Sequence, residues 1–168
     1  MHARHFQIRL EHEADASLLS ELSARAFGPG RFARAAYRVR EGFRPIASLC
    51  LTGWLDDRLI GGVRFTPVTI GSAGNAVLLG PLVVEPTEKG SGYGHALVQE
   101  GLVRAKAQGY GLVLLVGDML YFGRFGFSPV PGGQITLPGP VDPARLLALE
   151  LTPGALAKIS GEVRGLAL

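Results

Sequence analysis

The sequence predicts an α/β fold, a mixed and strongly twisted sheet with helices on both faces. Three observations predict it. A chain of 168 residues fits one domain, so the whole range 1–168 is expected to form a single unit. Hydrophobic residues make up 47% and charged residues 18%, which supplies a core and excludes a disordered chain. Segments with strand and helix periodicity alternate along the chain, without internal repeats or an interdomain linker.

Charge and composition exclude several function classes. The net charge of +3 could attract an anionic ligand but is too small to predict a nucleic-acid partner. No apolar run is long enough for a membrane span, and the first residues lack the apolar region of a signal peptide. The single cysteine, Cys50, excludes an internal disulfide, and the histidines show no metal-ligand spacing. We therefore expect a cytoplasmic protein with no metal and no membrane contact; its oligomeric state stays open, a homodimer included.

The first elements are a strand and two helices. Apolar residues alternate over 4–10, which predicts a half-buried strand. Asp15 is expected to cap the following helix by accepting the free N–H groups of its first turn. Gly28 should end that helix, and a second helix is predicted over 31–40.

Three strands come next. The ranges 46–55 and 59–70 form a predicted hairpin around the turn Asp56-Asp57-Arg58. A further strand runs from Asn75 to Val84 and is apolar at consecutive positions, as expected when both faces are covered. Because proline cannot donate a ladder hydrogen bond, Gly80-Pro81 predicts a bulge or a splayed strand.

The rest of the chain begins with a long helix that should end near Gly109. Its predicted apolar face comprises Leu97, Val98, Gly101, Leu102 and Ala105. A buried strand over 112–116 and a short segment over 118–127 follow. The Pro- and Gly-rich stretch 129–140 is interpreted as a loop, and 146–151 as the last strand. Thr152 and Pro153 should then start a short helix.

The turn from Lys89 to Gly94 has the composition of a phosphate-binding loop. It lies between a strand and a helix, whose first N–H groups have no partner within the helix. Glycines let an anion reach the backbone, and Lys89 adds a positive charge. The spacing fits neither a P-loop nor a dinucleotide-binding fingerprint, so a tight turn without ligand is the alternative.

The residues around this turn form a wider pattern that resembles a known family motif. The sequence Leu82-Val83-Val84-Glu85-Pro86-x-x-Lys89-Gly90-x-Gly92-x-Gly94 resembles the acetyl-CoA motif of the GNAT N-acetyltransferases. Lys89 stands where that family has Arg or Gln. Downstream, Arg124-Phe125-Gly126-Phe127 resembles the family's second motif, and the surrounding sequence is most similar to its YhbS-like bacterial branch. The resemblance covers residues 4 to about 130 and implies a GNAT-like domain.

The resemblance implies a function and a set of contacts. It implies an N-acetyltransferase that takes acetyl-CoA as acyl donor, without a metal, and an amine, in a small molecule or a peptide, as acceptor. The amine would attack the thioester directly. The residues that would contact acetyl-CoA are Leu82, Val83, Val84, Lys89, Gly90, Ser91, Gly92, Tyr93, Gly94, His95 and Phe122.

One expected hydroxyl is missing. The leaving thiolate needs a proton, which the family usually takes from a tyrosine four residues before its Gly-Phe pair. Counting back from Gly126 gives Phe122, which cannot donate one. Tyr121 is the candidate substitute; water is the second source, because a thiol is a tolerable leaving group. The third alternative is a non-catalytic protein that binds or senses acyl-CoA.

Other polar residues have two interpretations each. Glu85 is either the base that takes a proton from the amine or a solvated or capping carboxylate. Asp118 either orients the amine or caps the helix that follows it. Cys50 is expected to be a small core residue. A charged helical face, interpreted as solvated or as bordering an acidic acceptor, comprises Arg31, Arg34 and Arg38.

Overall fold

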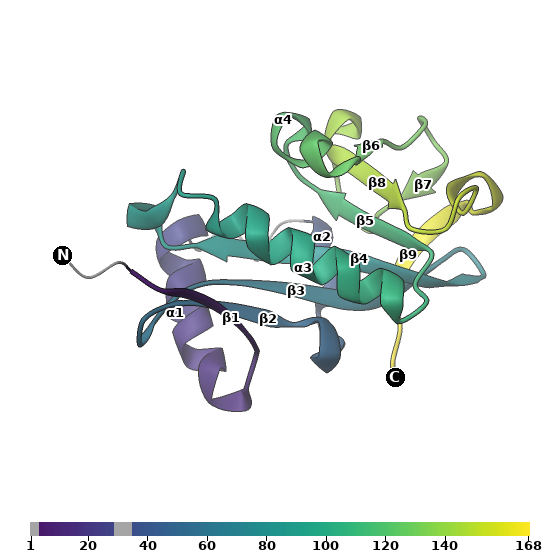
Figure 1. Cartoon of the computed structure of the whole chain (residues 1–168). Helices are drawn as coiled ribbons and strands as arrows, with labels where there is room; N and C mark the ends of the chain where they lie inside the picture. The colour runs from purple at the N-terminus through teal and green to yellow at the C-terminus, as the bar shows by residue number, and fades with distance from the viewer. Residues whose placement is uncertain (1–3, 29–34) are drawn as a thin grey trace.

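In a computed structural model, which describes residues 4–28 and 35–168, a twisted mixed sheet carries helices on both faces (Figure 1). The strands follow the order β1-β2-β3-β4-β5-β8-β6, with β9 pairing β3 and β7. Their bounds are β1 Phe6–Leu10, β2 Leu51–Leu55, β3 Arg58–Ile70, β4 Ala73–Val84, β5 Leu112–Val116, β6 Ser128–Pro129, β7 Ile135–Thr136, β8 Leu146–Glu150 and β9 Gly161–Gly165. The helices are α1 Ala16–Phe27, α2 Ala35–Arg40, α3 Tyr93–Ala107 and α4 Met119–Phe122.

Strand β3 shows why helices cover both faces. A Cβ on Gly62 would lie 2.6 Å from Leu19 of α1, whereas one on the adjacent Gly61 would lie 3.1 Å from Leu97 of α3. Neighbouring residues of a strand point to opposite faces, so α1 and α3 pack on opposite sides of the sheet. A Cβ on Gly101 of α3 would clash with Phe65, which shows how closely this helix approaches the sheet. None of the helices in the described residues is both long and apolar enough to cross a bilayer.

Strand β4 changes its pairing at Gly80-Pro81. Before this pair, Ala76–Leu78 lie in parallel register with Leu112–Leu114 of β5 and antiparallel to β3. After it, Leu82–Val84 pair with β3, and the described residues provide no β5 partner on the other edge. Two residues of β4 face one of β3 at this point, which is a β-bulge. The prediction of a bulge or a splayed strand is confirmed.

Most elements before residue 128 follow the predictions. The strand over 4–10 is β1, the hairpin turns at Asp56, and β4 includes Asn75 but begins at Ala73. Helix α1 ends at Gly28, which has a φ of 71°. Leu97, Val98, Gly101, Leu102 and Ala105 of α3 are all buried. The first part of the second predicted helix, including Arg31 and Arg34, lies outside the described residues, and α2 occupies its last six residues.

Two predictions in this region are wrong. The Asp15 carboxylate accepts the N–H of His12 at 2.8 Å, three residues earlier, so it closes a 3-10 turn before α1. Ala47–Leu49 forms another 3-10 turn, and the predicted strand begins only at Leu51. Leu49 is nevertheless fully buried, because an apolar side chain can enter the core from a turn as well as from a strand.

The C-terminal region differs most from the prediction. The stretch 129–140, interpreted as a loop, contains β7 and the end of β6. The backbone carbonyl of Thr152 accepts the N–H of Ala155 within a turn. In place of the predicted short helix, only the 3-10 turn Leu156–Lys158 follows. The strand over 146–151 is β8 but is not the last one, since β9 pairs with the far end of β3.

Candidate functional site

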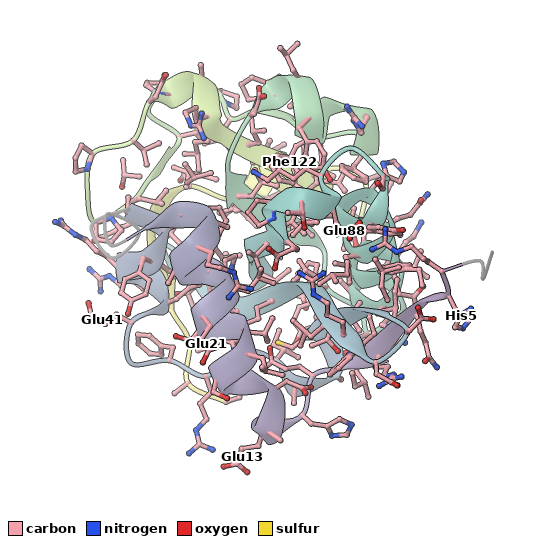
Figure 2. The ribbon with its side chains drawn as sticks, turned by 90° about the vertical axis from the view of Figure 1, so that its left-hand side faces the viewer. His5, Glu13, Glu21, Glu41, Glu88 and Phe122 are labelled. Carbon is pink, nitrogen blue, oxygen red and sulfur yellow. The ribbon has the colours of Figure 1, made fainter. Side chains whose placement is uncertain are left out.

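The open end of β4 borders a cleft of about 1090 Å³. That volume is slightly above the range of about 300–1,000 Å³ that is typical for small-molecule sites. Its walls come from α1, α2, β3 and the open end of β4 on one side, and from the end of β5 and α4 on the other. Figure 2 views the molecule from the end of β4, with Phe122 above Glu88 and with Glu21 and Glu41 lying on the α1 and α2 side. Of the predicted site residues, Leu82, Val83, Lys89, Tyr121 and Phe122 line the cleft.

The turn from Lys89 to Gly94, called the glycine turn below, starts at the edge of the cleft and leads into α3. A 3-10 turn, Pro86–Glu88, separates it from β4. Gly90 and Gly92 have φ values of 87° and 85°, which favour glycine, and Gly92 is the N-cap residue of α3. The N–H of Ala96 bonds the Gly92 carbonyl at 3.0 Å, so the preceding first-turn N–H groups of the helix are available to an anion.

Gly94 is where three elements meet. A Cβ at this position would lie 2.9 Å from the Tyr121 hydroxyl of α4 and 3.2 Å from Val84 of β4. The absence of a side chain therefore lets the first turn of α3, the open end of β4 and α4 converge. The predicted residues Leu82, Val84, Gly94 and Tyr121 come together here, although they lie up to 39 positions apart in the sequence.

The two aromatic residues of α4 have different environments. The Tyr121 hydroxyl reaches the start of α3, and burial raises the pKa of this phenol while the Arg124 guanidinium, 4.9 Å from the ring centre, opposes the rise. The Phe122 ring packs over Gly117, where a Cβ would lie 2.6 Å away, and meets Phe127 of the core edge-on. Tyr121 therefore brings a protonated hydroxyl to the cleft, whereas Phe122 forms part of its apolar wall.

The side chains of the glycine turn do not all face the cleft. The Tyr93 ring stacks on Phe6 of β1 with centroids 4.5 Å apart. The His95 ring stacks on Phe125, 4.6 Å between centroids. Gly90, Ser91 and Gly92 do not line the cleft, and they connect Lys89 at its edge to the start of α3. What these positions offer in common is their backbone.

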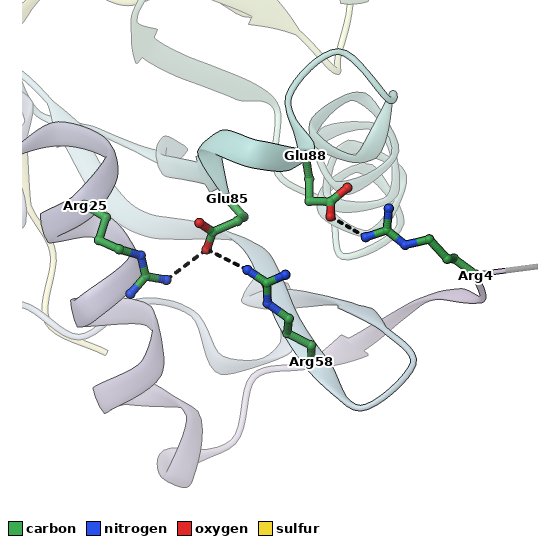
Figure 3. A network of polar contacts seen from close by, with 5 residues as sticks. All are labelled: Arg4, Arg25, Arg58, Glu85 and Glu88. Atoms are coloured by element: carbon green, nitrogen blue, oxygen red, sulfur yellow. Dashed lines mark hydrogen bonds and ion pairs between the residues drawn. The ribbon is translucent and has the colours of Figure 1, made fainter.

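Both interpretations of Glu85 need correction. Glu85 is only 7% exposed, so its carboxylate is not solvated. It does not line the cleft either, so it does not lie where a base for the amine would be needed. No cap hydrogen bond forms from its side chain. Its carboxylate instead pairs with Arg25 of α1 at 2.9 Å and with Arg58 at 3.7 Å (Figure 3).

The remaining candidates have local roles. Asp118 lines the cleft and caps α4, because its Oδ1 accepts the N–H of Leu120 at 3.0 Å. Cys50 lies just before β2 and is 2% exposed, which confirms the core interpretation; burial raises its pKa to about 11. Arg38 is exposed and lies 3.3 Å from the Cβ position of Gly139.

Sequence reasoning missed a charged pair in the cleft wall. Arg64 of β3 lies opposite the Gly80-Pro81 bulge and forms a two-point ion pair with Glu11, at 2.8 and 3.1 Å. The signal was available, since Arg64 is the one charged residue inside the apolar stretch 59–70. Within residues 4–28 and 35–168, no group of three or more potential ligands could hold a metal ion.

Known proteins are similar to this chain in sequence and in architecture. Residues 17–127 match the model of the acetyltransferase (GNAT) family. The N-acetyltransferase YjhQ of Escherichia coli K12 is 29% identical over 80% of this chain and 76% of its own length. The N-acetyltransferase YhbS of the same strain is 32% identical over 72% of each chain.

Solved structures agree with these sequence matches. The crystal structure of E. coli YhbS in complex with CoA superposes with a TM-score of 0.83, at 28% identity, over 99% of this chain and 92% of its own. A GNAT-family acetyltransferase of Brucella melitensis in complex with acetyl-CoA gives a TM-score of 0.69, at 27% identity, over 95% of each chain. With its family match covering well over half of the sequence, and with the splayed strand and glycine turn in place, this chain belongs to the acetyltransferase (GNAT) family.

Proposed function

We propose that the chain, as one domain over residues 1–168, transfers an acetyl group from acetyl-CoA to an amine. The observation that carries this proposal is the convergence at Gly94, where the glycine turn, the open edge of β4 and the Tyr121 hydroxyl meet beside the cleft. The CoA and acetyl-CoA complexes of the two similar crystal structures support the choice of donor.

The backbone and Lys89 would hold the donor. The left-handed glycines and the first N–H groups of α3 would present several backbone donors, which suits the diphosphate of coenzyme A. Lys89, at the edge of the cleft, adds a positive charge. Leu82, Val83 and Val84 offer to the pantetheine arm the backbone edge that has no partner strand in residues 4–28 and 35–168, and Phe122 offers an apolar wall. The predicted contacts of Ser91, Tyr93 and His95 belong to the same proposal.

When bound, acetyl-CoA supplies the acetyl group, which a neutral amine takes by direct attack on the thioester. Backbone N–H groups near Val83 and Val84 polarise the carbonyl, because preorganised donors stabilise the charge that develops on its oxygen. Cys50 does not act as a nucleophile in this route, because its thiol is buried in the core and stays neutral. The proposed transfer therefore proceeds without a covalent enzyme intermediate.

Tyr121 is the proposed acid. Because burial raises its pKa above the ordinary value near 10, the phenol is protonated throughout the neutral range. Its hydroxyl lies at the start of α3, within reach of a ligand held there, and it can give a proton to the leaving thiolate. The proton that the attacking amine loses then restores the phenol, so the step balances. The acceptor is an amine in a small molecule or a peptide, and the single, unpaired cysteine supports a reducing cytosol as the compartment.

One observation favours a second candidate, a protein that binds or senses acyl-CoA without turnover. Phe122 replaces the hydroxyl that the family usually provides, and it is packed against Gly117 and the core. Such a protein would bind acetyl-CoA through the same turn, with no acid needed.

Thiol release from acetyl-CoA across a panel of amines tests both candidates. We expect turnover in the wild type and, for Tyr121→Phe, a loss of about 10² in kcat with little change in the melting-temperature rise caused by acetyl-CoA. The matched control is Leu120→Ser on the same helix, since this side chain is 88% exposed and does not line the cleft. Full turnover in Tyr121→Phe would remove Tyr121 as the acid.

The other outcomes separate the two candidates. Stabilisation by acetyl-CoA without turnover on any amine would favour the sensing protein. No stabilisation and no turnover would reject both.

A further inference from the structure

Two buried carboxylates frame the short turn that connects β4 to the glycine turn. Glu85 precedes the 3-10 turn and Glu88 ends it, directly before Lys89. The two residues are 7% and 8% exposed. Neither lines the cleft, so the proposed chemistry uses neither of them. A buried carboxylate is costly unless it is paired, so their partners indicate what they do.

The partners are three arginines from three separate parts of the chain (Figure 3). Arg25 of α1 and Arg58 at the start of β3 approach the same oxygen of Glu85, at 2.9 and 3.7 Å. Arg4, which lies just before β1, bonds Glu88. All three guanidinium side chains are more than half exposed, so each reaches inward from the surface to a buried acid.

These ion pairs lie where few backbone hydrogen bonds hold the chain in place. Beyond Gly80-Pro81, β4 pairs only with β3 in the described residues. After Val84, one backbone bond, from the Glu85 N–H to the Ile60 carbonyl at 2.7 Å, continues that ladder. The glycine turn itself has little conformational preference of its own.

We propose that Glu85 and Glu88, with Arg25, Arg58 and Arg4, are positioning residues for the glycine turn. They fix both ends of the 3-10 turn, so the backbone N–H groups of the glycine turn are already aimed before a ligand arrives. Preorganisation of this kind lowers the entropic cost of binding. The inference rests on the proposed function, in which this turn holds the diphosphate of coenzyme A.

Charge gives the arginines a second effect. Two uncompensated carboxylates next to a diphosphate would repel it, whereas three guanidinium groups outnumber them and add to the charge of Lys89. The loss of one arginine therefore loosens the turn and makes its surroundings more negative. The electrostatic part of this effect should be larger at low ionic strength, because salt screens exposed charges.

Calorimetric titration of coenzyme A into the full-length protein tests the inference, at two salt concentrations and well below the melting temperature. We expect Glu85→Gln and Arg25→Met to weaken the Kd for coenzyme A by about fivefold or more. Arg25→Lys, which keeps the charge, should stay closer to the wild type. The control is Arg164→Met in β9, which removes an exposed ion pair with Glu162, 3.1 Å long and remote from the turn.

A merely structural role would lower the melting temperature of the variants and leave their Kd unchanged. If the wild type binds coenzyme A and Glu85→Gln and Arg25→Met bind it within about twofold of the wild type, the positioning role is overturned and the proposed function stands. If the wild type does not bind at about 1 mM, the proposed function fails, and this inference with it. Should Glu85→Gln not fold, Arg4→Met, which removes the pair at Glu88 and leaves both carboxylates in place, decides the question by the same criterion.

Discussion

The two halves of β4, taken as Ala76–Leu78 and Leu82–Val84, are both apolar but have different surroundings. In the closed half, Ala76–Leu78 use both backbone edges, one toward β3 and one toward β5, and their side chains are buried. In the open half, Leu82–Val84 pair with β3 alone among the residues that the structure describes, and Leu82 and Val84 are half-buried. The bulge at Gly80-Pro81 separates the halves. A few residues thus change a core strand into one wall of a cleft.

The comparison shows that hydrophobicity does not separate core from site in this strand. Backbone pairing does, because an unpaired edge keeps its polar groups for water or for a ligand. Changes in the closed half should therefore alter the stability of the fold, and changes around the open half should alter binding.

The largest expected effect comes from the closed half. Leu78 is fully buried between β3 and β5, so Leu78→Ala should lower the free energy of unfolding by about 2–5 kcal/mol. Urea unfolding measures this loss, and titration with coenzyme A below the melting temperature should give a Kd close to that of the wild type. A Kd weakened tenfold in the folded variant would show that the two halves are not separate in function.

Sequence reasoning succeeded where one segment carries its own signal. The bulge was predictable because proline lacks an N–H, and α3 because its apolar face recurs at helical spacing. The glycine turn was predictable from its composition and from its place between a strand and a helix. These are local properties of consecutive residues, so no knowledge of distant partners was needed.

It failed where a residue's role is set by distant partners. Strand β9 is only five residues long and has little signal except its pairing with β3 and β7. Glu85 was treated as a base or a solvated group, because its partners Arg25 and Arg58 lie 60 and 27 positions earlier in the chain. Tyr121 and Gly94 were both predicted as site residues, but their close approach could not be predicted from the sequence.

The next effect tests how well water is excluded from the core around Cys50, just before β2. Burial raises the pKa of Cys50 to about 11, partly offset by a backbone hydrogen bond involving Phe65, against about 9 for an exposed thiol. The neutral thiol therefore stabilises the fold fully below about pH 9, and this contribution is lost as the pH rises toward 11. The loss amounts to roughly 2–3 kcal/mol.

Unfolding curves of the wild type and Cys50→Ala between pH 7.5 and about 11 measure it, because the variant lacks the titrating group. The difference between the two proteins should shrink as the pH rises. A difference in the free energy of unfolding that stays constant with pH would mean that water reaches the Cys50 thiol despite its burial.

The smallest effect separates backbone strain from ligand binding at the open half. Gly92 and Gly154 have almost the same φ, 85° and 84°, and both have open space where a Cβ would stand. Alanine at either position therefore costs about 1–2 kcal/mol of stability through the left-handed backbone alone. Only Gly92 lies on the glycine turn, so Gly92→Ala should also weaken the binding of coenzyme A, whereas Gly154→Ala should leave its Kd unchanged. Because the two variants carry equal strain, equal Kd values would mean that the turn takes no part in binding, and the open half of β4 would then lose its proposed ligand.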